Sequence, residues 1–323
     1  AVDAILSRRM MAFDDGSTMI PKVAVFAGQG AQYVGMGKDL AVDNDIARLF
    51  DRANAVLDFD LKEVCFEGPA ESLTQSNHCQ PAIFVVSVAC WQAFRNRYPD
   101  CTFTAAAGLS LGEWTALRVA GVLDFETTVR VLEARGRFMQ EACNETPGGM
   151  VSVMTLPFEK VREICAATGT TMANLNSESQ IVLSGTREAV AEAERAALEA
   201  GGKAVVLNVA GAFHSPLMAS ARERLAAMLK DIEFATPSLP VLSNVTGAPH
   251  AMDGATIRET MLRQITEPVH WMSCVRAAGA QTFIEFGPGK VLSGLIKRID
   301  RQNQVANVRD AATLETVAEL ANA

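Results

Sequence analysis

Four short apolar segments, each ending in glycine, recur along the chain and are separated by segments of helical periodicity. They read KVAVFAG (22–28), TFTAAAG (102–108), LPVLSNVTG (239–247) and QTFIEFGPG (281–289). A short apolar or β-branched run before a glycine turn is typical of a strand. Because the hydrophobicity is nearly continuous rather than alternating, these strands are expected in a parallel sheet that is buried on both faces.

Helical patterns lie between these strands, over 112–123, 125–142 and 220–232. Alternation of strands and helices predicts an α/β fold with right-handed crossovers and a parallel sheet. With 323 residues, of which 49% are hydrophobic, the chain can form a large core.

One internal segment has a different order of elements. Residues 148–209 read as strand, helix, two short strands, helix and strand, which is the β-α-β-β-α-β unit of ferredoxin-like folds. We therefore predict a ferredoxin-like small subdomain over 146–211, inserted into an α/β core formed by 22–145 and 212–310. Residues 1–21 match no periodic pattern and are treated as an N-terminal extension.

Composition excludes several classes of protein. No apolar run reaches the roughly 18 residues that span a bilayer, so no membrane association is expected. The net charge of −8 argues against nucleic acid as a partner. Seven scattered cysteines without a C-x-x-C pair argue against a disulfide framework and a zinc site, and indicate the cytosol or the matrix of an organelle.

The segment GLSLG (108–112) has the spacing G-x-S-x-G between a predicted strand and a predicted helix. That context is the one in which a nucleophilic serine sits on a sharp turn with its hydroxyl exposed. The helix N-terminus would also favour an oxyanion beside Ser110. The alternative is a tight turn in which Ser110 only caps the helix.

A serine nucleophile needs a base, and the chain contains four histidines: His78, His214, His250 and His270. His78 is expected in a polar loop before a helix, and a structural role is open to each of the four. His214 follows the inserted unit directly, where the chain re-enters the core beside an interdomain cleft. That position makes His214 the best candidate for the base.

Seven ordered motifs give the chain a family resemblance. They are FAGQGAQYVGMG (26–37), GPAESLTQSNHCQPAIF (68–84), GLSLGEWTAL (108–117), EARGRFMQEA (133–142), AGAFHSPLM (210–218), LRQITEPVHW (262–271) and EFGPGKVLSGL (285–295). Together they resemble the malonyl-CoA:acyl-carrier-protein transacylases of fatty-acid synthesis and the acyltransferase domains of polyketide synthases. The resemblance spans about residues 22 to 300, and it implies a hydrolase-like α/β core with a ferredoxin-like subdomain.

The resemblance also implies a ping-pong reaction. Malonyl-CoA would acylate Ser110, with His214 as the base, and the malonyl group would pass to the phosphopantetheine thiol of holo acyl carrier protein. The backbone N–H groups of Gln29 and Leu111 would form the oxyanion hole, and the Gln264 carbonyl would orient the histidine. No cofactor would be bound permanently, since the CoA thioester is a substrate.

The helix predicted over 125–142 carries an arginine on its apolar side. At 3.6 residues per turn Arg135 falls on the stripe of Val131, Leu132, Phe138, Met139 and Ala142, whereas Arg130 and Arg137 fall opposite. An inward arginine needs a partner, and a structural Asp or Glu is one possibility. The resemblance implies another, because Arg135 matches the family arginine that binds the malonyl carboxylate, a geometry suited to a bidentate pair.

Further residues bear on the choice of substrate through the resemblance. In related polyketide domains, a phenylalanine before the catalytic histidine accompanies malonyl, so Phe213 favours malonyl. Phe213 and Met139 would limit the space at the malonyl α-carbon. Asn174, Asn176 and Gln180 match positions where the family lines the cleft.

Two other activities share the chemistry of an acyl-serine. A discrete polyketide-pathway acyltransferase would catalyse the same reaction with a different carrier. A serine hydrolase or thioesterase would instead admit water to the acyl-enzyme, and an inward Arg135 would then have no evident purpose.

Overall fold

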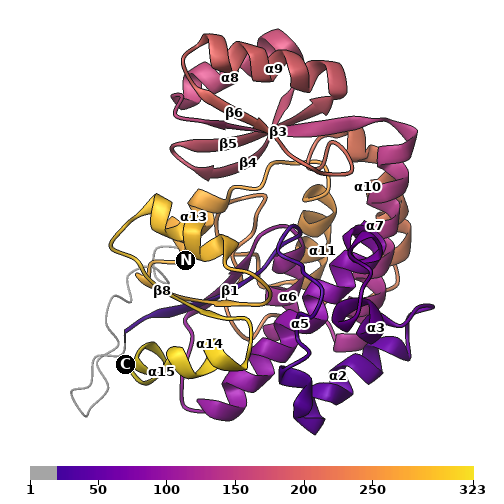
Figure 1. Cartoon of the computed structure of the whole chain (residues 1–323), viewed down its shortest axis with the longest axis vertical. Helices are drawn as coiled ribbons and strands as arrows, with labels where there is room; N and C mark the ends of the chain where they lie inside the picture. Colours follow the sequence, from indigo (N-terminus) through magenta and orange to yellow (C-terminus); the bar gives the residue numbers. More distant parts are fainter. Residues whose placement is uncertain (1–19) are drawn as a thin grey trace.

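The computed structural model describes residues 20–323 and contains two four-stranded sheets. Figure 1 shows the antiparallel sheet of the smaller unit, with its two helices, above the parallel sheet of the larger unit. Of the extension predicted for 1–21, residues 1–19 lie outside the described residues. The α/β fold class with a parallel sheet and an inserted antiparallel unit is confirmed.

The parallel sheet has the order β2-β1-β7-β8, with β2 at Ala105–Gly108, β1 at Lys22–Phe26, β7 at Thr282–Phe286 and β8 at Gln304–Val308. In β1, Ala24 and Phe26 face one hydrophobic cluster while Val23 and Val25 face another. Apolar side chains are therefore needed on both faces of β1, which explains its continuous apolar sequence.

Helices cover both faces of this sheet. The long buried helix α5 (Ser76–Arg97) and α7 (Phe125–Glu145) belong to the cluster on one face. The helices α12 (Trp271–Ala277) and α13 (Val291–Ile299) contribute to the other. The predicted loop at His78 is wrong, because α5 already begins at Ser76.

One predicted strand is wrong and another was missed. The segment 239–247 forms only an isolated bridge to β2, at Val241. Pairing stops there because the side chain of Asn244 bonds the Gly108 carbonyl and the Ser110 N–H, which further pairing would have used. The fourth strand is β8, whose sequence QVANV is polar and partly exposed at the sheet edge, so it lacks the apolar signal.

The antiparallel sheet has the order β4-β5-β3-β6, with β3 at Gly148–Met154, β4 at Thr171–Ser177, β5 at Gln180–Thr186 and β6 at Lys203–Val206. The helices α8 (Phe158–Thr168) and α9 (Arg187–Glu199) cover one face. Side chains of β3 and β5 alternate between the faces. Val151 and Leu183 pack under the helices, while Met150 and Val182 point toward the core of the large sheet.

The remaining elements complete the layer around the large sheet. They are η1 (Leu40–Val42), α2 (Asn44–Asn54), α3 (Leu61–Phe66), α4 (Ala70–Thr74), α6 (Leu111–Val119), η2 (Pro216–Met218), α10 (Ala219–Leu229), α11 (Gly254–Arg263), α14 (Ala311–Thr316) and α15 (Ala318–Asn322). Over residues 20–323, no helix has both the length and the apolar character needed to cross a bilayer.

A close backbone approach at Gly112 predicts a large loss of stability on substitution. A Cβ at Gly112 would lie 2.1 Å from the Phe26 carbonyl oxygen, so Gly112→Ala must push α6 away from β1. We expect a loss of about 3 kcal/mol or more in the free energy of unfolding. Gly294→Ala on the exposed side of α13 is the control, since no atom lies within 4 Å and helix propensity predicts a gain of about 0.5–1 kcal/mol. Urea unfolding measures both, and equal effects would contradict the prediction.

Candidate active site

The candidate site lies where β1 and β2 end side by side. Phe26 pairs with Gly108 in the parallel register, so the loops after both strands leave the same edge of the sheet. A Cβ at Gly28 would lie 2.5 Å from the Leu109 carbonyl oxygen, which shows how closely the two loops approach. This contact brings the loop with Gln29 against the turn with Ser110.

Ser110 occupies the sharp turn between β2 and α6. Its backbone has φ 54° and ψ −103°, a region that non-glycine residues rarely adopt. Its side chain makes no capping hydrogen bond to α6, so the alternative of a capping serine is excluded. Asn244 holds the turn, because its Oδ1 accepts from the Ser110 N–H at 2.7 Å and its Nδ2 donates to the Gly108 carbonyl at 2.8 Å.

His214 lies against the serine hydroxyl. Its Nε2 is 2.9 Å from Ser110 Oγ and its Nδ1 is 2.8 Å from the Gln264 carbonyl oxygen. A carbonyl only accepts hydrogen bonds, so Nδ1 carries the proton and Nε2 of the neutral ring accepts from the serine. His214 also has a positive φ of 54°; Thr155 is the one other non-glycine residue with positive φ in the described part of the chain.

The other three histidines lie in other surroundings. His250 Nε2 bonds the buried carboxylate of Glu113 at 2.6 Å. His78 bonds Ser72 from within α5, and His270 is the residue that precedes α12. Of the four candidates, the structure brings only His214 to Ser110.

The environment of His214 favours the neutral ring. Burial, and then the positive charge of Arg135, lower the pKa of His214 from its ordinary value to about 4. At neutral pH the imidazole is therefore uncharged and its Nε2 is free to take a proton. Such a group fulfils the requirement for a general base within hydrogen-bond reach of the hydroxyl.

This pKa predicts the acid limb of the acylation rate. Because the base must be neutral, we expect kcat/KM for acylation to stay level down to about pH 5 and to halve near pH 4, rather than near the ordinary histidine value of about 6.5. The depressed pKa also means that the unfolded chain binds the proton more readily, so stability decreases as pH falls from about 6.5 to about 4. Rapid-quench acylation with circular dichroism at each pH tests this, and an inflection near 6.5 in folded protein would contradict it.

Arg135 lies on α7 behind the serine and is 1% exposed. Its Nη1 donates to Gln80 Oε1 at 2.7 Å, and its Nη2 donates to Ser110 Oγ at 3.0 Å and to Gln264 Oε1 at 3.1 Å. Its Nε has no partner within the described residues. All its acceptors are neutral, so the alternative of an ion pair with a structural Asp or Glu is excluded.

Burial lowers the pKa of Arg135 to about 10, which still leaves the guanidinium charged at neutral pH. Arg130 and Arg137 on the same helix are exposed, as their position opposite the stripe predicts. The site therefore contains a buried cation without an anionic partner, directly beside the hydroxyl of Ser110. An acidic group on a ligand would satisfy it.

Two residues whose backbone N–H groups are predicted to form an oxyanion hole are Gln29 and Leu111. Leu111 is the first residue of α6, so no carbonyl of its own helix accepts from its N–H. Gln29 lies in the loop after β1 and lines the same cleft as Ser110. Leu111 thus directly follows Ser110 in the chain and Gln29 lines the same cleft, and the oxyanion hole itself stays a prediction.

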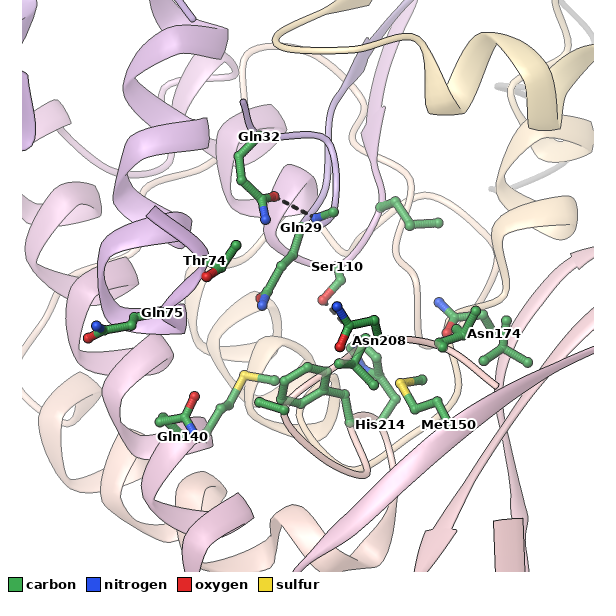
Figure 2. Close-up of a pocket in the computed structure, with 18 of the residues that line it drawn as sticks. Gln29, Gln32, Thr74, Gln75, Ser110, Gln140, Met150, Asn174, Asn208 and His214 are labelled. Carbon is green, nitrogen blue, oxygen red and sulfur yellow. Dashed lines mark hydrogen bonds between the residues drawn. The ribbon is translucent and has the colours of Figure 1, made fainter. Parts of the chain in front are cut away.

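A cleft of about 540 Å³ opens onto Ser110 and His214 between the two sheets. Figure 2 shows the labelled side chains around Ser110, many of which end in amide groups. Met139, Phe213 and Asn174 line the cleft together with Asn176, and no charged side chain of residues 20–323 lines it. Gln180 was expected in this wall and does not line the cleft, because its side chain is bound to Ser152 and Arg298 beside the turn between β4 and β5.

Three polar residues beneath the cleft escaped the sequence analysis, and a fourth, His250, was considered there only as one of the four histidines. Gln80 contacts Arg135, and Glu113, Asn244 and His250 form a buried network around the turn at Ser110. All four have little or no exposure. The one signal in the sequence is a polar residue in an apolar surrounding, such as Gln80 in CQPAIFVV.

Comparison with known proteins shows similarity to one family over most of the chain. The acyl transferase domain family matches residues 23–319. The malonyl CoA-acyl carrier protein transacylase of Bacillus subtilis is 39% identical over 301 residues, which cover 90% of this chain and 94% of the relative.

Solved structures of similar proteins share the fold closely. The malonyl CoA-acyl carrier protein transacylase of Clostridium perfringens superposes with a TM-score of 0.88 at 37% identity, covering 93% of this chain and 97% of the other. The malonyl-transacylase PlMCAT, solved with the type II PKS acyl-carrier protein AntF, has a TM-score of 0.88 at 36% identity over 93% of this chain and 99% of the other. With the fold, the match over 23–319 and these identities in agreement, the chain belongs to the acyl transferase family that includes the malonyl-CoA–acyl carrier protein transacylases.

Proposed function

We propose that this protein transfers a malonyl group from malonyl-CoA to the phosphopantetheine thiol of holo acyl carrier protein, supplying extender units for fatty-acid synthesis. The reaction passes through a malonyl ester on Ser110. The names of the relatives support the substrate and the carrier. The geometry of Ser110, His214 and Arg135 supports the path of the reaction.

Arg135 carries the proposal most directly. Its Nη2 lies 3.0 Å from Ser110 Oγ, and no carboxylate of the described chain neutralises it. In a malonyl ester one methylene separates the carbonyl on Oγ from the free carboxylate, so the carboxylate remains within reach of the guanidinium. An acetyl ester has no carboxylate, so Arg135 gives the site a means of discriminating malonyl from acetyl.

In the first half-reaction, His214 Nε2 removes the proton from Ser110 Oγ as the oxygen attacks the thioester carbonyl. The N–H groups of Gln29 and Leu111 receive the oxyanion. The tetrahedral intermediate then collapses, the C–S bond breaks, and His214 returns the proton to the departing thiolate of CoA. The Gln264 carbonyl keeps the ring in the required tautomer throughout.

In the second half-reaction, the phosphopantetheine thiol of the carrier gives its proton to His214 and attacks the malonyl ester. The ester C–O bond breaks and Ser110 Oγ recovers the proton. The uncharged, amide-rich cleft suits the pantetheine arm that CoA and the carrier share. No step needs a permanently bound cofactor, since the CoA thioester is itself the substrate.

The subdomain limits remain part of the proposal. We assign 22–145 and 212–310 to the core and 146–211 to the small subdomain. The elements of this subdomain run from β3 to β6 along the chain, both included. We place the protein in the cytoplasm or an organellar matrix. All seven cysteines are free in the described chain, which fits a reducing compartment.

The test is the intact mass of the protein after mixing with malonyl-CoA and, separately, with acetyl-CoA. We expect a malonyl adduct that persists in buffer and disappears when holo acyl carrier protein is added. An adduct that is lost in buffer alone would instead indicate a hydrolase or thioesterase. Equal labelling by acetyl-CoA would contradict the role of Arg135.

The carrier decides between the two pathways. PlMCAT acts with a type II PKS acyl-carrier protein, so a polyketide carrier is a second candidate partner. The chase should therefore use a fatty-acid carrier and a polyketide carrier in parallel. Faster removal of the malonyl group by the polyketide carrier would overturn the assignment to fatty-acid synthesis.

A further inference from the structure

We infer that Glu113 is a positioning residue that sets the selectivity for malonyl through the side chain of Gln264. This inference rests on the proposed function. Glu113 contacts neither Arg135 nor the cleft, so it would act through other residues. Its position on α6, one turn after Ser110, places its carboxylate beneath the nucleophile.

The Glu113 carboxylate is completely buried and receives three hydrogen bonds. His250 Nε2 donates at 2.6 Å and the Asn244 N–H at 3.2 Å, both to Oε1, while Gln264 Nε2 donates to Oε2. A buried carboxylate requires such donors, since an unpaired charge in the interior is costly. The three donors come from segments that are far apart in the sequence.

Glu113 determines which way the Gln264 amide points. A carboxylate only accepts hydrogen bonds, so the amide nitrogen must face Glu113, and the amide oxygen then faces Arg135 Nη2 at 3.1 Å. The reverse orientation would set the amide NH₂ against the guanidinium and the amide oxygen against the carboxylate. Arg135 is therefore held in place by an acceptor whose orientation depends on Glu113 together with the Ser110 carbonyl, since both accept from Gln264 Nε2.

The same carboxylate also supports Ser110. It accepts from the backbone N–H of Asn244. The side chain of Asn244 in turn bonds the Gly108 carbonyl and the Ser110 N–H, on either side of Leu109 in the strained turn. In addition, Gln264 Nε2 donates to the Ser110 carbonyl at 3.0 Å. Loss of Glu113 should thus lower acylation by any thioester, and should lower acylation by malonyl-CoA further because Arg135 is displaced as well.

Charge gives Glu113 a second link to Arg135. One amide separates the buried anion from the buried cation, and the negative charge of Glu113 raises the pKa of Arg135 against the effect of burial. The carboxylate thereby helps to keep the guanidinium charged while the cleft is empty. The Nε–H of Arg135 has no hydrogen-bond partner among the described residues.

The test compares acylation rates with malonyl-CoA and acetyl-CoA in Glu113→Gln. A glutamine presents one acceptor in place of two and adds two N–H donors, which allows the Gln264 amide to turn over. We expect the malonyl-to-acetyl rate ratio to fall about ten- to a hundredfold, the range for hydrogen bonds to charged groups. A merely structural role would lower both rates alike and leave the ratio unchanged, which would overturn the inference.

His250→Gln is the matched control, because it alters another bond of the same carboxylate and leaves the contact between Glu113 and Gln264 intact. We expect the ratio in this variant to stay within about twofold of the wild type, whatever the change in melting temperature. A ratio that falls as far as in Glu113→Gln would show a general effect of the network and would overturn the inference.

A second variant keeps the test decisive if Glu113→Gln does not fold. Gln264→Leu removes the amide but retains the backbone carbonyl that orients His214, and should reproduce the fall in the ratio. An unchanged ratio in Gln264→Leu would overturn the inference. Failure of the proposed function is distinct, since wild-type protein would then form no malonyl adduct, and the inference would fall with it.

Discussion

Ser110→Ala should abolish the malonyl adduct and lower transfer by at least about 10⁴-fold, the scale seen when an activated nucleophile is removed. The structure gives the reason, because Oγ lies both 2.9 Å from His214 Nε2 and 3.0 Å from Arg135 Nη2. The Ser110 N–H and its bond to Asn244 remain in the variant, so the turn should persist. Intact mass after mixing with malonyl-CoA measures the loss.

Thr74→Val provides the control for this result. Thr74 carries the only other hydroxyl group that lines the cleft in the described chain, and no residue with a proposed catalytic role contacts it. We expect the adduct to form as in wild type, and peptide mapping should place it on Ser110. A malonyl group that remains in Ser110→Ala, on any residue, would contradict the assignment of the nucleophile.

Much of the fold could be predicted because strand signals depend on burial. The strands β1, β2 and β7 are buried on both faces, and each was visible as an apolar run before glycine. The segment 239–247 has the same composition, yet Asn244 ends its pairing after one bridge. The edge strand β8 is partly exposed, so its sequence is not a continuous apolar run and hydrophobicity alone does not predict it.

The small sheet was predictable for a different reason. Its strands alternate between a face under α8 and α9 and a face toward the cleft, and each helix has a single apolar side. Local periodicity of hydrophobic residues thus predicts all four strands and both helices of this unit. The order β4-β5-β3-β6 depends on pairing between residues that are far apart in the sequence, so periodicity does not predict it. It follows from the arrangement that a β-α-β-β-α-β unit adopts.

The candidate site was predictable only in part. The G-x-S-x-G spacing indicates Ser110, but His214 lies 104 residues further along and was chosen by its position at the re-entry of the chain and by resemblance. Glu113 and Asn244 could not be found in this way. Their role depends on hydrogen bonds among α6, the loop after Val241 and the end of α11, which no local pattern records.

Arg135→Ala should remove the preference for malonyl-CoA over acetyl-CoA. The variant removes the cation that contacts Ser110 Oγ at 3.0 Å, so acylation by malonyl-CoA should fall about 10²- to 10³-fold, the cost of leaving a buried charge unpaired. Acetyl-CoA has no carboxylate to lose a partner, so its rate should change much less. Rapid-quench acylation with both thioesters gives the ratio.

Arg137→Ala on the same helix separates selectivity from stability. Arg137 is exposed and paired with Glu133 at 3.1 Å, an interaction worth about 0.5 kcal/mol, so neither rate should change appreciably. Arg135→Ala, by contrast, removes a buried side chain that donates to Gln80, Ser110 and Gln264, and some loss of stability is expected. For that reason the decisive quantity is the malonyl-to-acetyl ratio in folded protein. A ratio equal to the wild-type value would mean that another group binds the malonyl carboxylate.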